Sequence, residues 1–441
     1  MSRSVPASAA TDHDFVAEPS RDAFTRVYDA GAPQVVWTRL VADLETPVSA
    51  FLKLSDGRPM STLLESVEGG AIRGRYSFIG LKPDLIWRAN GDAAEINRTA
   101  LTNPTAFTRE RETALKSLRA LLAESRIALP AGLPPNAAGV IGYMGYDTAR
   151  LIENLPDVPP DHLGVPDAIL MRPTLTIVFD TIKDEMIVVT PVFPSPATAA
   201  SDAYAAALDR LQSVIDALDE PTPHIAAASA SVMQLPATAS NTSPAEYLGM
   251  VARAKEYIAA GDIFQVVLAQ RFSAPFTLPP FALYRALRRT NQSPFLYHLD
   301  FGNFAIERYS HVMHISSTVV GTLDPKHDAI DALFAGLPAG TLSGAPKVRA
   351  MQIIDELEKS KRGPYGGCVG YFSADGQMDT CIVLRTAIVK DGQIHVQAGA
   401  GVVSDSDAAA EQQECVYKSA ALFRAAEEAV RFAAKARKGN R

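Results

Sequence analysis

The sequence GTLSGAPKVRAMQIIDELE, residues 340–358, combines a glycine-bounded loop of hydroxyl side chains with the start of a helix. Its apolar residues recur every third position, at Val348, Met351, Ile354 and Leu357. This spacing predicts a helix with one apolar face. Pro346 suits the first helical turn, where a missing N–H has no cost, and Gly363-Pro364 is expected to end the helix.

The same stretch has the composition of an anion-binding loop. A helix N-terminus presents unpaired N–H groups and a partial positive charge. Thr341 and Ser343 add hydroxyl groups, and Lys347 and Arg349 add positive charges. The alternative is an ordinary loop-to-helix junction with solvated basic residues, which this stretch by itself slightly favours.

Composition excludes several classes of protein. No run of about 18 apolar residues is present, so no membrane-spanning helix is expected. The first ten residues are small and polar, which predicts no secretory signal. Three cysteines without metal-type spacing (Cys368, Cys381 and Cys415) fit a reducing cytoplasm. A net charge of −7 argues against nucleic acid as a partner.

The order of the predicted segments divides the chain. Residues 1–20 are expected to be a flexible tail, and 21–221 an N-terminal domain. Residues 222–243 are rich in Ala, Ser, Thr and Pro and almost uncharged, which predicts a linker. A second domain is expected over 244–435, followed by a tail over 436–441.

Strand-like and helical patterns alternate in both halves. In the first half we expect helices at 109–124 and 197–218 and strands at 76–80, 138–143, 174–179 and 185–189. In the second half Ser243 and Glu246 form a capping box that begins a helix. We also expect strands at 263–272, 295–299, 303–306 and 308–320, a helix at 281–289, a three-strand meander at 367–373, 378–389 and 394–398, and a final helix at 407–435.

Two features near the meander could bind an anion. Gly399-Ala400-Gly401 follows a predicted strand, and glycine would let backbone N–H groups approach a ligand closely, although a simple turn is at least as plausible. Arg385 lies in an otherwise apolar predicted strand. A buried arginine requires an anionic partner, either a ligand carboxylate or an internal ion pair.

The final helix carries Glu411, Glu414 and Lys418 on one stripe. This stripe is either a solvated Glu-to-Lys pair or a carboxylate ligand for Mg²⁺. His311 and His314 have a zinc-like spacing, but positions i and i+3 of a strand point to opposite faces. No third ligand is evident, so we reject zinc.

Taken together, these segments closely resemble component I of anthranilate synthase, within the chorismate-utilising enzyme family. The resemblance covers about residues 35–435 and is most specific from 243 to 420. The motifs that carry it, in chain order, are GDIFQVVL (261–268), ERYSHVMH (307–314), the stretch 340–358, YGG (365–367), DTCIVLR (379–385) and QAGAG (397–401).

The resemblance implies a fold, a reaction and a set of site residues. The fold is α+β, with two large antiparallel sheets packed on each other and helices outside. The reaction adds ammonia to chorismate, a dianion, and releases pyruvate and anthranilate for tryptophan synthesis. By resemblance, the substrate-binding residues are Tyr365, Arg385, Gly399, Ala400, Gly401 and Lys418, and the catalytic residues are His314, Thr341 and Gln265. Mg²⁺ would bridge the substrate carboxylate and Glu414.

Two positions distinguish members of the family. Gln265 stands where members that add water carry a lysine base, and a carboxamide cannot activate water as a general base. Thr341-Leu342-Ser343 is similar to the anthranilate enzyme, whereas the aminodeoxychorismate enzyme of folate synthesis has another hydroxyl order. The aminodeoxychorismate enzyme is therefore the alternative activity.

The resemblance also implies regulation and partners. Leu63-Leu64-Glu65-Ser66 is similar to the family's tryptophan feedback motif, which Pro294, Phe295 and Leu296 complete. The region 21–221 would then be the regulatory domain. A glutamine amidotransferase subunit would supply ammonia, so we expect a cytoplasmic hetero-oligomer without nucleic acid or membrane partners.

The resemblance breaks between Ile306 and Glu307. Family members carry a segment of roughly 80 residues there, more than half the size of a typical domain. That segment holds a substrate-contacting loop and the glutamate that is the other Mg²⁺ ligand. Its absence predicts an incomplete C-terminal half and leaves Glu414 without its partner. A catalytically impaired remnant or binding subunit is therefore the second interpretation.

Overall fold

The computed structural model describes residues 15–66, 75–223, 238–290, 295–308 and 320–438. Residues 1–14 and 439–441 of the predicted tails, part of the predicted linker and most of the strand expected at 308–320 lie outside these ranges. The rest of the two predicted tails is structured, because Glu18 forms a β-bridge with Trp37 and residues 436–438 continue the final helix. Within them, no helix combines the length and the apolar character needed to cross a membrane.

The strands of the first half are β1 (Gln34–Val41), β2 (Ser61–Ser66), β3 (Tyr76–Asn90), β4 (Ala93–Asn97), β5 (Thr108–Thr113), β6 (Gly139–Met144), β7 (Ala168–Asp180) and β8 (Glu185–Val192). Those of the second half are β9 (Ala239–Ser240), β10 (Gln265–Pro275), β11 (Phe295–Asp300), β12 (Phe304–Arg308), β13 (Gly344–Ala345), β14 (Cys368–Ser373), β15 (Met378–Ile382), β16 (Thr386–Lys390) and β17 (Gln393–Val402).

The helices are α1 (Arg21–Asp29), α2 (Pro47–Ser55), α3 (Ala114–Glu124), α4 (Ala200–Asp219), α5 (Pro244–Ala259), α6 (Pro280–Thr290), α7 (Ala329–Gly336), α8 (Lys347–Leu357) and α9 (Ala408–Lys438). Short 3-10 turns are η1 (Pro135–Ala137), η2 (Tyr146–Leu151) and η3 (Gly340–Leu342). The capping box predicted at α5 is confirmed, because the Ser243 side chain accepts from the Glu246 N–H and the Glu246 side chain accepts from the Ser243 N–H.

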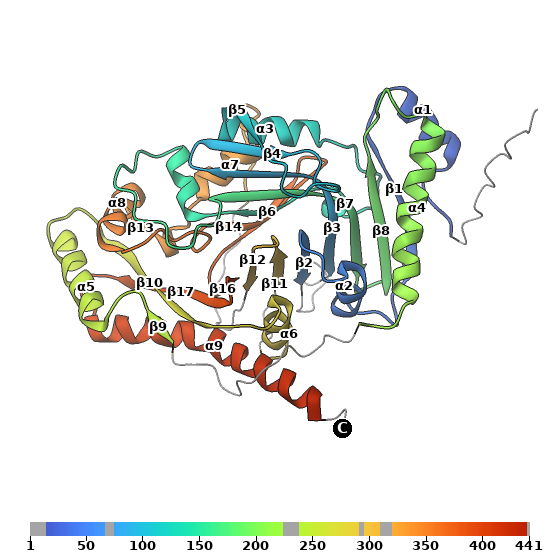
Figure 1. The fold of residues 1–441 in the computed structure, drawn as a ribbon. Coiled ribbons are helices and arrows are strands. Elements are labelled where there is room, and N and C mark those ends of the chain that lie inside the picture. Colours follow the sequence, from blue (N-terminus) through green and yellow to red (C-terminus); the bar gives the residue numbers. More distant parts are fainter. Residues whose placement is uncertain (1–14, 67–74, 224–237, 291–294, 309–319, 439–441) are drawn as a thin grey trace, which may run out of the picture.

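The strands form antiparallel ladders that fold into two layers (Figure 1). One layer contains β3, β6, β7 and β14, and the other contains β10, β11, β12, β16 and β17. An apolar core that includes Ile141 and Met171 from the first layer and Leu299 and Ile388 from the second lies between them. The predicted α+β fold of packed antiparallel sheets is therefore confirmed.

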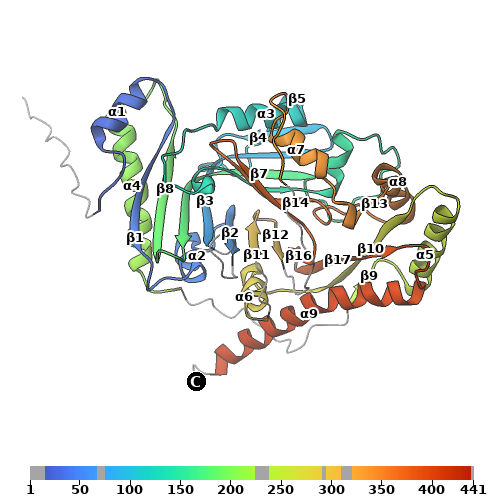
Figure 2. The same ribbon diagram turned by 180° about the vertical axis from the view of Figure 1, so that it is seen from behind.

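Helices cover the outer faces of both layers (Figures 1 and 2). Helices α5, α8 and α9 pack on β10 and β17 around a core that includes Val251, Ile354 and Leu422. Helices α1, α2 and α4 cover β1, β3 and β8, and α3 and α7 contribute to a third core with β3, β4 and β14. This arrangement leaves the ends of β10 and β17 and the beginning of β16 to form the site.

The hydrogen-bonded ladders cross the boundary predicted at 222–243. Strand β2 pairs with β11, with Phe295 opposite Ser66, and β6 pairs with β14. Segments that are far apart in sequence therefore share both layers, although the division into two domains stays a prediction.

Two local expectations were wrong. The predicted helix at 109–124 begins only at Ala114, because residues 108–113 pair as β5 with β4. The predicted strand at 378–389 is broken: β15 pairs with β14 in one layer, and β16 pairs with β12 and β17 in the other. Arg385, between them, has a left-handed backbone with φ of 51°. The chain changes layers at this residue.

Two smaller expectations also differ from the structure. Gly399, Ala400 and Gly401 lie inside β17 and not in a turn after it, because they pair with Ala269, Leu268 and Val267 of β10. Helix α8 ends at Leu357, before Gly363-Pro364. Pro346 is its N-cap residue and not part of the first turn.

The predicted deletion point lies inside β12. Ile306 and Glu307, on its two sides, pair with Ile388 and Ala387 of β16. The other edge of β12 pairs with β11, where Glu307 is opposite His298. The ladder therefore continues without interruption through the point where the resemblance breaks.

Candidate active site

A small apolar cluster brings three of the predicted motifs together. It consists of Ala269 on β10, Leu342 on η3, and Tyr365, with Ile382 and Leu384 packed against it. Leu342 follows Thr341 directly, and Leu384 precedes Arg385. The loop at 340–342, the Tyr365 segment and the crossing between layers therefore meet at Ala269, in the first half of β10.

Tyr365 is buried and lies against Gly399. A β-carbon at position 399 would lie 3.0 Å from the Tyr365 hydroxyl oxygen and 2.9 Å from the Leu268 carbonyl oxygen. Only glycine permits this approach without displacing backbone. Burial raises the pKa of Tyr365, so its hydroxyl stays protonated at neutral pH and can donate a hydrogen bond.

Gln265 begins β10, and its side chain lies against Gly401, although Gly401 is opposite Val267 in the ladder. A β-carbon at Gly401 would lie 3.2 Å from Nε2 of Gln265. The registered pairs of β16 with β17 end at Val396, so this part of β17 pairs with β10 through Gly399, Ala400 and Gly401. The predicted backbone segment and the predicted carboxamide are thus brought together.

Helix α9 adds a positive charge to the same strand. Nζ of Lys418 donates to the Gly399 carbonyl at 2.9 Å and lies 2.5 Å from Oε1 of Glu414. The Lys418 and Glu414 side chains are 37% and 48% exposed, so a ligand can reach both. The i, i+4 pair expected from the sequence is present, and its lysine is directed at the Gly399 backbone.

Glu414 does not by itself make a magnesium site. Mg²⁺ requires near-octahedral oxygen ligands, usually from one or two carboxylates together with substrate oxygens and water. The Glu414 carboxylate is already paired with Lys418. No group of three or more His, Cys, Asp or Glu side chains suited to a metal is found among the described residues. The described donors therefore do not fit a complete site.

Arg385 lies where the chain leaves one layer for the other. Its side chain is partly exposed, and the neighbouring Val383 exchanges backbone hydrogen bonds with Gly366 and Gly367 at 2.8 and 2.9 Å. The expectation that Arg385 lies within a strand was wrong. The strand pattern also did not predict that Arg385 lies close to the Tyr365 segment. The crossing at Arg385 therefore lies next to the Tyr365 segment.

The loop that begins the sequence argument contributes unequally to the site. Thr341 is exposed, whereas Ser343 is buried and donates to the Ala339 carbonyl at 3.0 Å. Arg349 is paired with Asp262 at 2.7 Å, and Lys347 donates to the Gly336 carbonyl at 3.2 Å. Thr341 is therefore the accessible hydroxyl of this loop.

The remaining predicted residues lie away from the cluster or outside the described ranges. His314 and Pro294 fall outside the described residues. Ser66 and Phe295 are opposite each other in the β2–β11 ladder, and Leu296 is buried in the core under α2 and α4.

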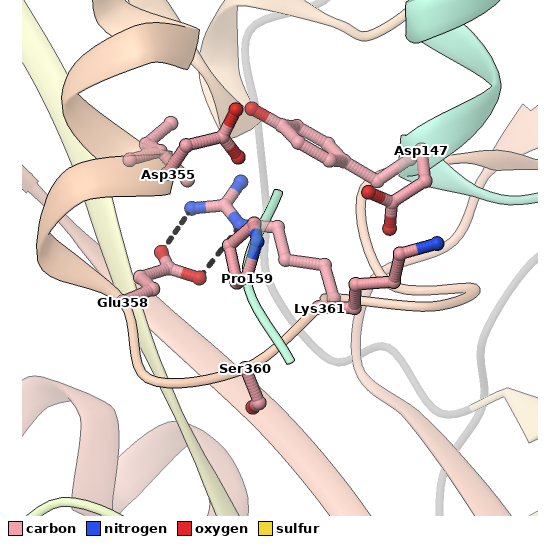
Figure 3. A pocket seen from close by; sticks show the side chains of 9 residues that line it. Asp147, Pro159, Asp355, Glu358, Ser360 and Lys361 are labelled. Carbon is pink, nitrogen blue, oxygen red and sulfur yellow. Dashed lines mark hydrogen bonds and ion pairs between the residues drawn. The ribbon is translucent and has the colours of Figure 1, made fainter. Parts of the chain in front are cut away.

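A buried ion pair behind the cluster was not predicted. Arg362 and Glu358 have side chains that are 1% and 3% exposed, and they form an i, i+4 ion pair. The separation of four residues between Glu358 and Arg362 could have indicated the ion pair. Both residues lie beyond the last residue of α8, so the helical pattern gave no reason to expect that they are buried. A small polar pocket lies beside this pair, and none of the predicted site residues lines it (Figure 3).

Comparison with known proteins shows the family of this chain. The model of the chorismate binding enzyme family matches residues 82–306 and 303–424. The chain therefore belongs to the chorismate binding enzyme family and is a chorismate-utilising enzyme by this relationship. The two matched segments meet at residues 303–306, where the resemblance was predicted to break.

Within this family the chain groups with anthranilate synthase component 1. It is 46% identical to that protein of Cereibacter sphaeroides over 499 aligned positions, covering 95% of this chain and 100% of the relative. It is 36% identical to that of Pseudomonas putida, covering 92% and 98%. Since 499 positions exceed the 441 residues of this chain, the first relative contains residues that have no counterpart here.

Solved structures agree on the fold. Anthranilate synthase component I from Streptococcus pneumoniae TIGR4 is 28% identical, with a TM-score of 0.67 over 87% of this chain and 99% of that one. The menaquinone-specific isochorismate synthase of Escherichia coli is 16% identical, with a TM-score of 0.61 over 90% and 95%. The second likeness concerns the fold alone.

Proposed function

We propose that this chain binds chorismate and acts as component I of anthranilate synthase. The reaction combines chorismate and ammonia to give anthranilate, pyruvate and water. The observation that carries the proposal is that Tyr365 and Lys418 both lie against Gly399 of β17, while the Gln265 side chain lies against Gly401. Leu342 and Leu384, the chain neighbours of Thr341 and Arg385, belong to the same apolar cluster as Tyr365. Two cationic side chains and two hydroxyls at one place suit a small dianion.

The chemical roles follow from the side chains. Arg385 and Tyr365 bind the enolpyruvyl carboxylate, and Lys418 neutralises charge near Gly399. Gln265 has no basic group, so it favours a neutral amine nucleophile over the activation of water. Thr341 contacts the substrate, and His314 assists departure of the hydroxyl or of pyruvate.

Further parts of the proposal concern partners and regulation. We identify no Cys–His pair suited to glutamine hydrolysis among the described residues. A separate glutamine amidotransferase therefore supplies ammonia in a cytoplasmic complex. Tryptophan binds near Ser66, Pro294, Phe295 and Leu296 and inhibits the enzyme. Magnesium dependence, which the family resemblance implies, rests here on Glu414, and we derive no catalytic step through the metal.

A second function is supported by a specific observation. The family model matches this chain in two segments that meet at residues 303–306, at the start of β12, and Glu414 belongs to no metal-binding group of side chains among the described residues. A group that contributes more in the transition state than in the ground state lowers the rate when it is lost. The chain could then retain chorismate or tryptophan binding without appreciable turnover.

One assay separates the two functions. The full chain is incubated with chorismate, an ammonium salt and Mg²⁺, and anthranilate is followed by its fluorescence. Turnover that Glu414→Ala abolishes supports the synthase. Chorismate binding by calorimetry without fluorescence supports the binding subunit, and absence of both contradicts the proposal.

A reciprocal variant tests the reason for low activity. The additional residues of the Cereibacter sphaeroides protein are inserted between Ile306 and Glu307. Restored turnover would assign the defect to the missing segment. A folded insertion variant that binds chorismate but stays inactive would contradict that explanation.

A further inference from the structure

Arg362 is almost completely buried and donates to three different parts of the site. Its Nη1 donates to the Leu342 carbonyl at 2.5 Å, and its Nη2 donates to the Val267 carbonyl at 2.7 Å. Its Nε and Nη2 also donate to the Glu358 carboxylate, the first at 3.0 Å (Figure 3). One guanidinium therefore connects the loop of Thr341, strand β10 and the end of α8.

Glu358 completes this connection. Its Oε1 accepts a hydrogen bond from the Ala269 N–H at 2.8 Å, so the ion pair contacts β10 at two positions. Ala269 is opposite Gly399 in the ladder and belongs to the apolar cluster with Leu342 and Tyr365. The carboxylate thus holds the backbone against which the glycine segment is placed.

The guanidinium also packs against two aromatic rings. Its central carbon lies 4.6 Å from the ring centroid of Tyr146 and 5.6 Å from that of Tyr365. Arg362 therefore contacts the residue whose hydroxyl lies against Gly399. Although burial opposes its charge, the Glu358 carboxylate keeps the pKa of Arg362 above its ordinary value, so the cation persists.

We propose that the Arg362–Glu358 pair is the positioning element of the chorismate pocket, fixing the Thr341 loop, β10 and Tyr365 relative to one another. This role rests on the proposed function. Arg362 acts through other residues and not on the substrate itself, because its side chain is 1% exposed and four of its five N–H groups donate to Leu342, Val267 and Glu358. The planar fork of arginine can bond to all of them at once, whereas the single ammonium of lysine cannot.

The first test replaces Arg362 by lysine in the full chain and measures chorismate affinity by calorimetry. The matched control is Arg172→Lys. Arg172 forms a bidentate pair with Asp84 at 2.9 and 2.7 Å, and its side chain is 12% exposed, but it contacts none of the site residues named above. Both variants replace a guanidinium that is paired with a carboxylate by an ammonium group. A general loss of stability from this exchange should therefore occur in both.

We expect a melting temperature lowered in both variants and chorismate affinity lowered only in Arg362→Lys. Displacement of reacting groups by about 1 Å can cost on the order of 100-fold in rate, which sets the scale of the expected loss of turnover. Where turnover is measurable, kcat should fall more than KM rises, since the Thr341 loop moves. Equal affinity in Arg362→Lys and Arg172→Lys would overturn the positioning role.

Two further variants keep the test informative if Arg362→Lys folds poorly. Glu358→Gln preserves shape and an acceptor for the Ala269 N–H but leaves the buried guanidinium without its counter-charge, so it should lower the melting temperature as well as chorismate affinity. Arg362→Ala should regain affinity on addition of guanidinium ion but not of potassium. A lack of response in both would overturn the role. Absence of chorismate binding by the unaltered chain would instead overturn the proposed function itself, and this role with it.

Discussion

The hydroxyl of Tyr365 occupies the space that a side chain at Gly399 would need. A β-carbon at 399 would lie 3.0 Å from that oxygen and 3.1 Å from the β-carbon of Ala269. Gly399 also offers its carbonyl to Lys418 at 2.9 Å. This residue is therefore in contact with a buried tyrosine on one side and with a partly exposed cation on the other.

The first prediction concerns this contact. Gly399→Ala should destabilise the fold by about 1–3 kcal/mol, because overpacking forces the backbone or Tyr365 to move. It should also weaken chorismate binding, measured by calorimetry. Gly249→Ala is the control: it lies in α5 with nothing within 4 Å of its added carbon, and should stabilise by about 0.5–1 kcal/mol. A neutral Gly399→Ala variant would contradict the close approach.

The second prediction separates charge from stability at Lys418. Lys418→Met should change the free energy of unfolding by less than about 1 kcal/mol, since the pair with Glu414 is partly exposed. Chorismate affinity should fall several-fold because a dianion loses a cation. Lys255→Met is the control, since Nζ of Lys255 likewise donates to a backbone carbonyl, that of Ser406, at 2.7 Å. Equal affinities in the two variants would argue against substrate contact.

The third prediction concerns the pH dependence of stability and strand β12, which contains the predicted deletion point. Glu307 and His298 are buried, with 3.2 Å between Oε1 and Nδ1, and Oε2 of Glu307 has no hydrogen-bond partner among the residues that the structure describes. Burial, with a contribution from Asp300, raises the pKa of Glu307 well above 4.5. Burial lowers the pKa of His298 from 6.5 to about 3.

Glu307 and His298 make the folding stability depend on pH in opposite directions. Above pH 4.5 the unfolded chain releases the Glu307 proton that the folded chain retains, so stability falls as pH rises, by up to about 1.4 kcal/mol per pH unit. Below pH 6.5 the unfolded chain binds a proton at His298 that the folded chain does not, so stability falls as pH decreases toward 3.

Glu307→Gln should therefore stabilise the protein at pH 7 to 8 and flatten the alkaline side of the stability curve. The loss below pH 6.5 should remain, because His298 is unchanged. Urea unfolding at a series of pH values provides the measurement. An alkaline slope that persists in Glu307→Gln would assign it to another group.

The fourth prediction concerns tryptophan. Ser66 is opposite Phe295 in the β2–β11 ladder. Calorimetry should detect tryptophan binding by the full chain, and Ser66→Arg should abolish it, because a large cation is introduced at the predicted site. Chorismate binding should be retained, since none of the proposed chorismate residues lies on β2 or β11. Unchanged tryptophan binding in Ser66→Arg would place the inhibitor elsewhere.

Local patterns in the sequence were sufficient for most helices and for the family. The capping box at Ser243 and the strands predicted at 174–179 and 185–189, which pair as β7 and β8, depend on residues close together in the chain, so their prediction needed no tertiary information. The motifs around Gln265, Tyr365 and Arg385 identified the family because they occur together in one order. The prediction of a helix over 109–113 was wrong because pairing of this segment with β4 prevailed over its helical propensity.

The sequence by itself therefore determined the family, the fold class and the residue types of the site. Only the tertiary structure decided that the chain changes layers at Arg385, that Gly399 to Gly401 lie within a strand, and that Arg362 and Glu358 are buried behind Thr341. Each of these depends on contact with segments far away in the chain. Such contacts decide which of several local conformations is stable, and no local pattern specifies them.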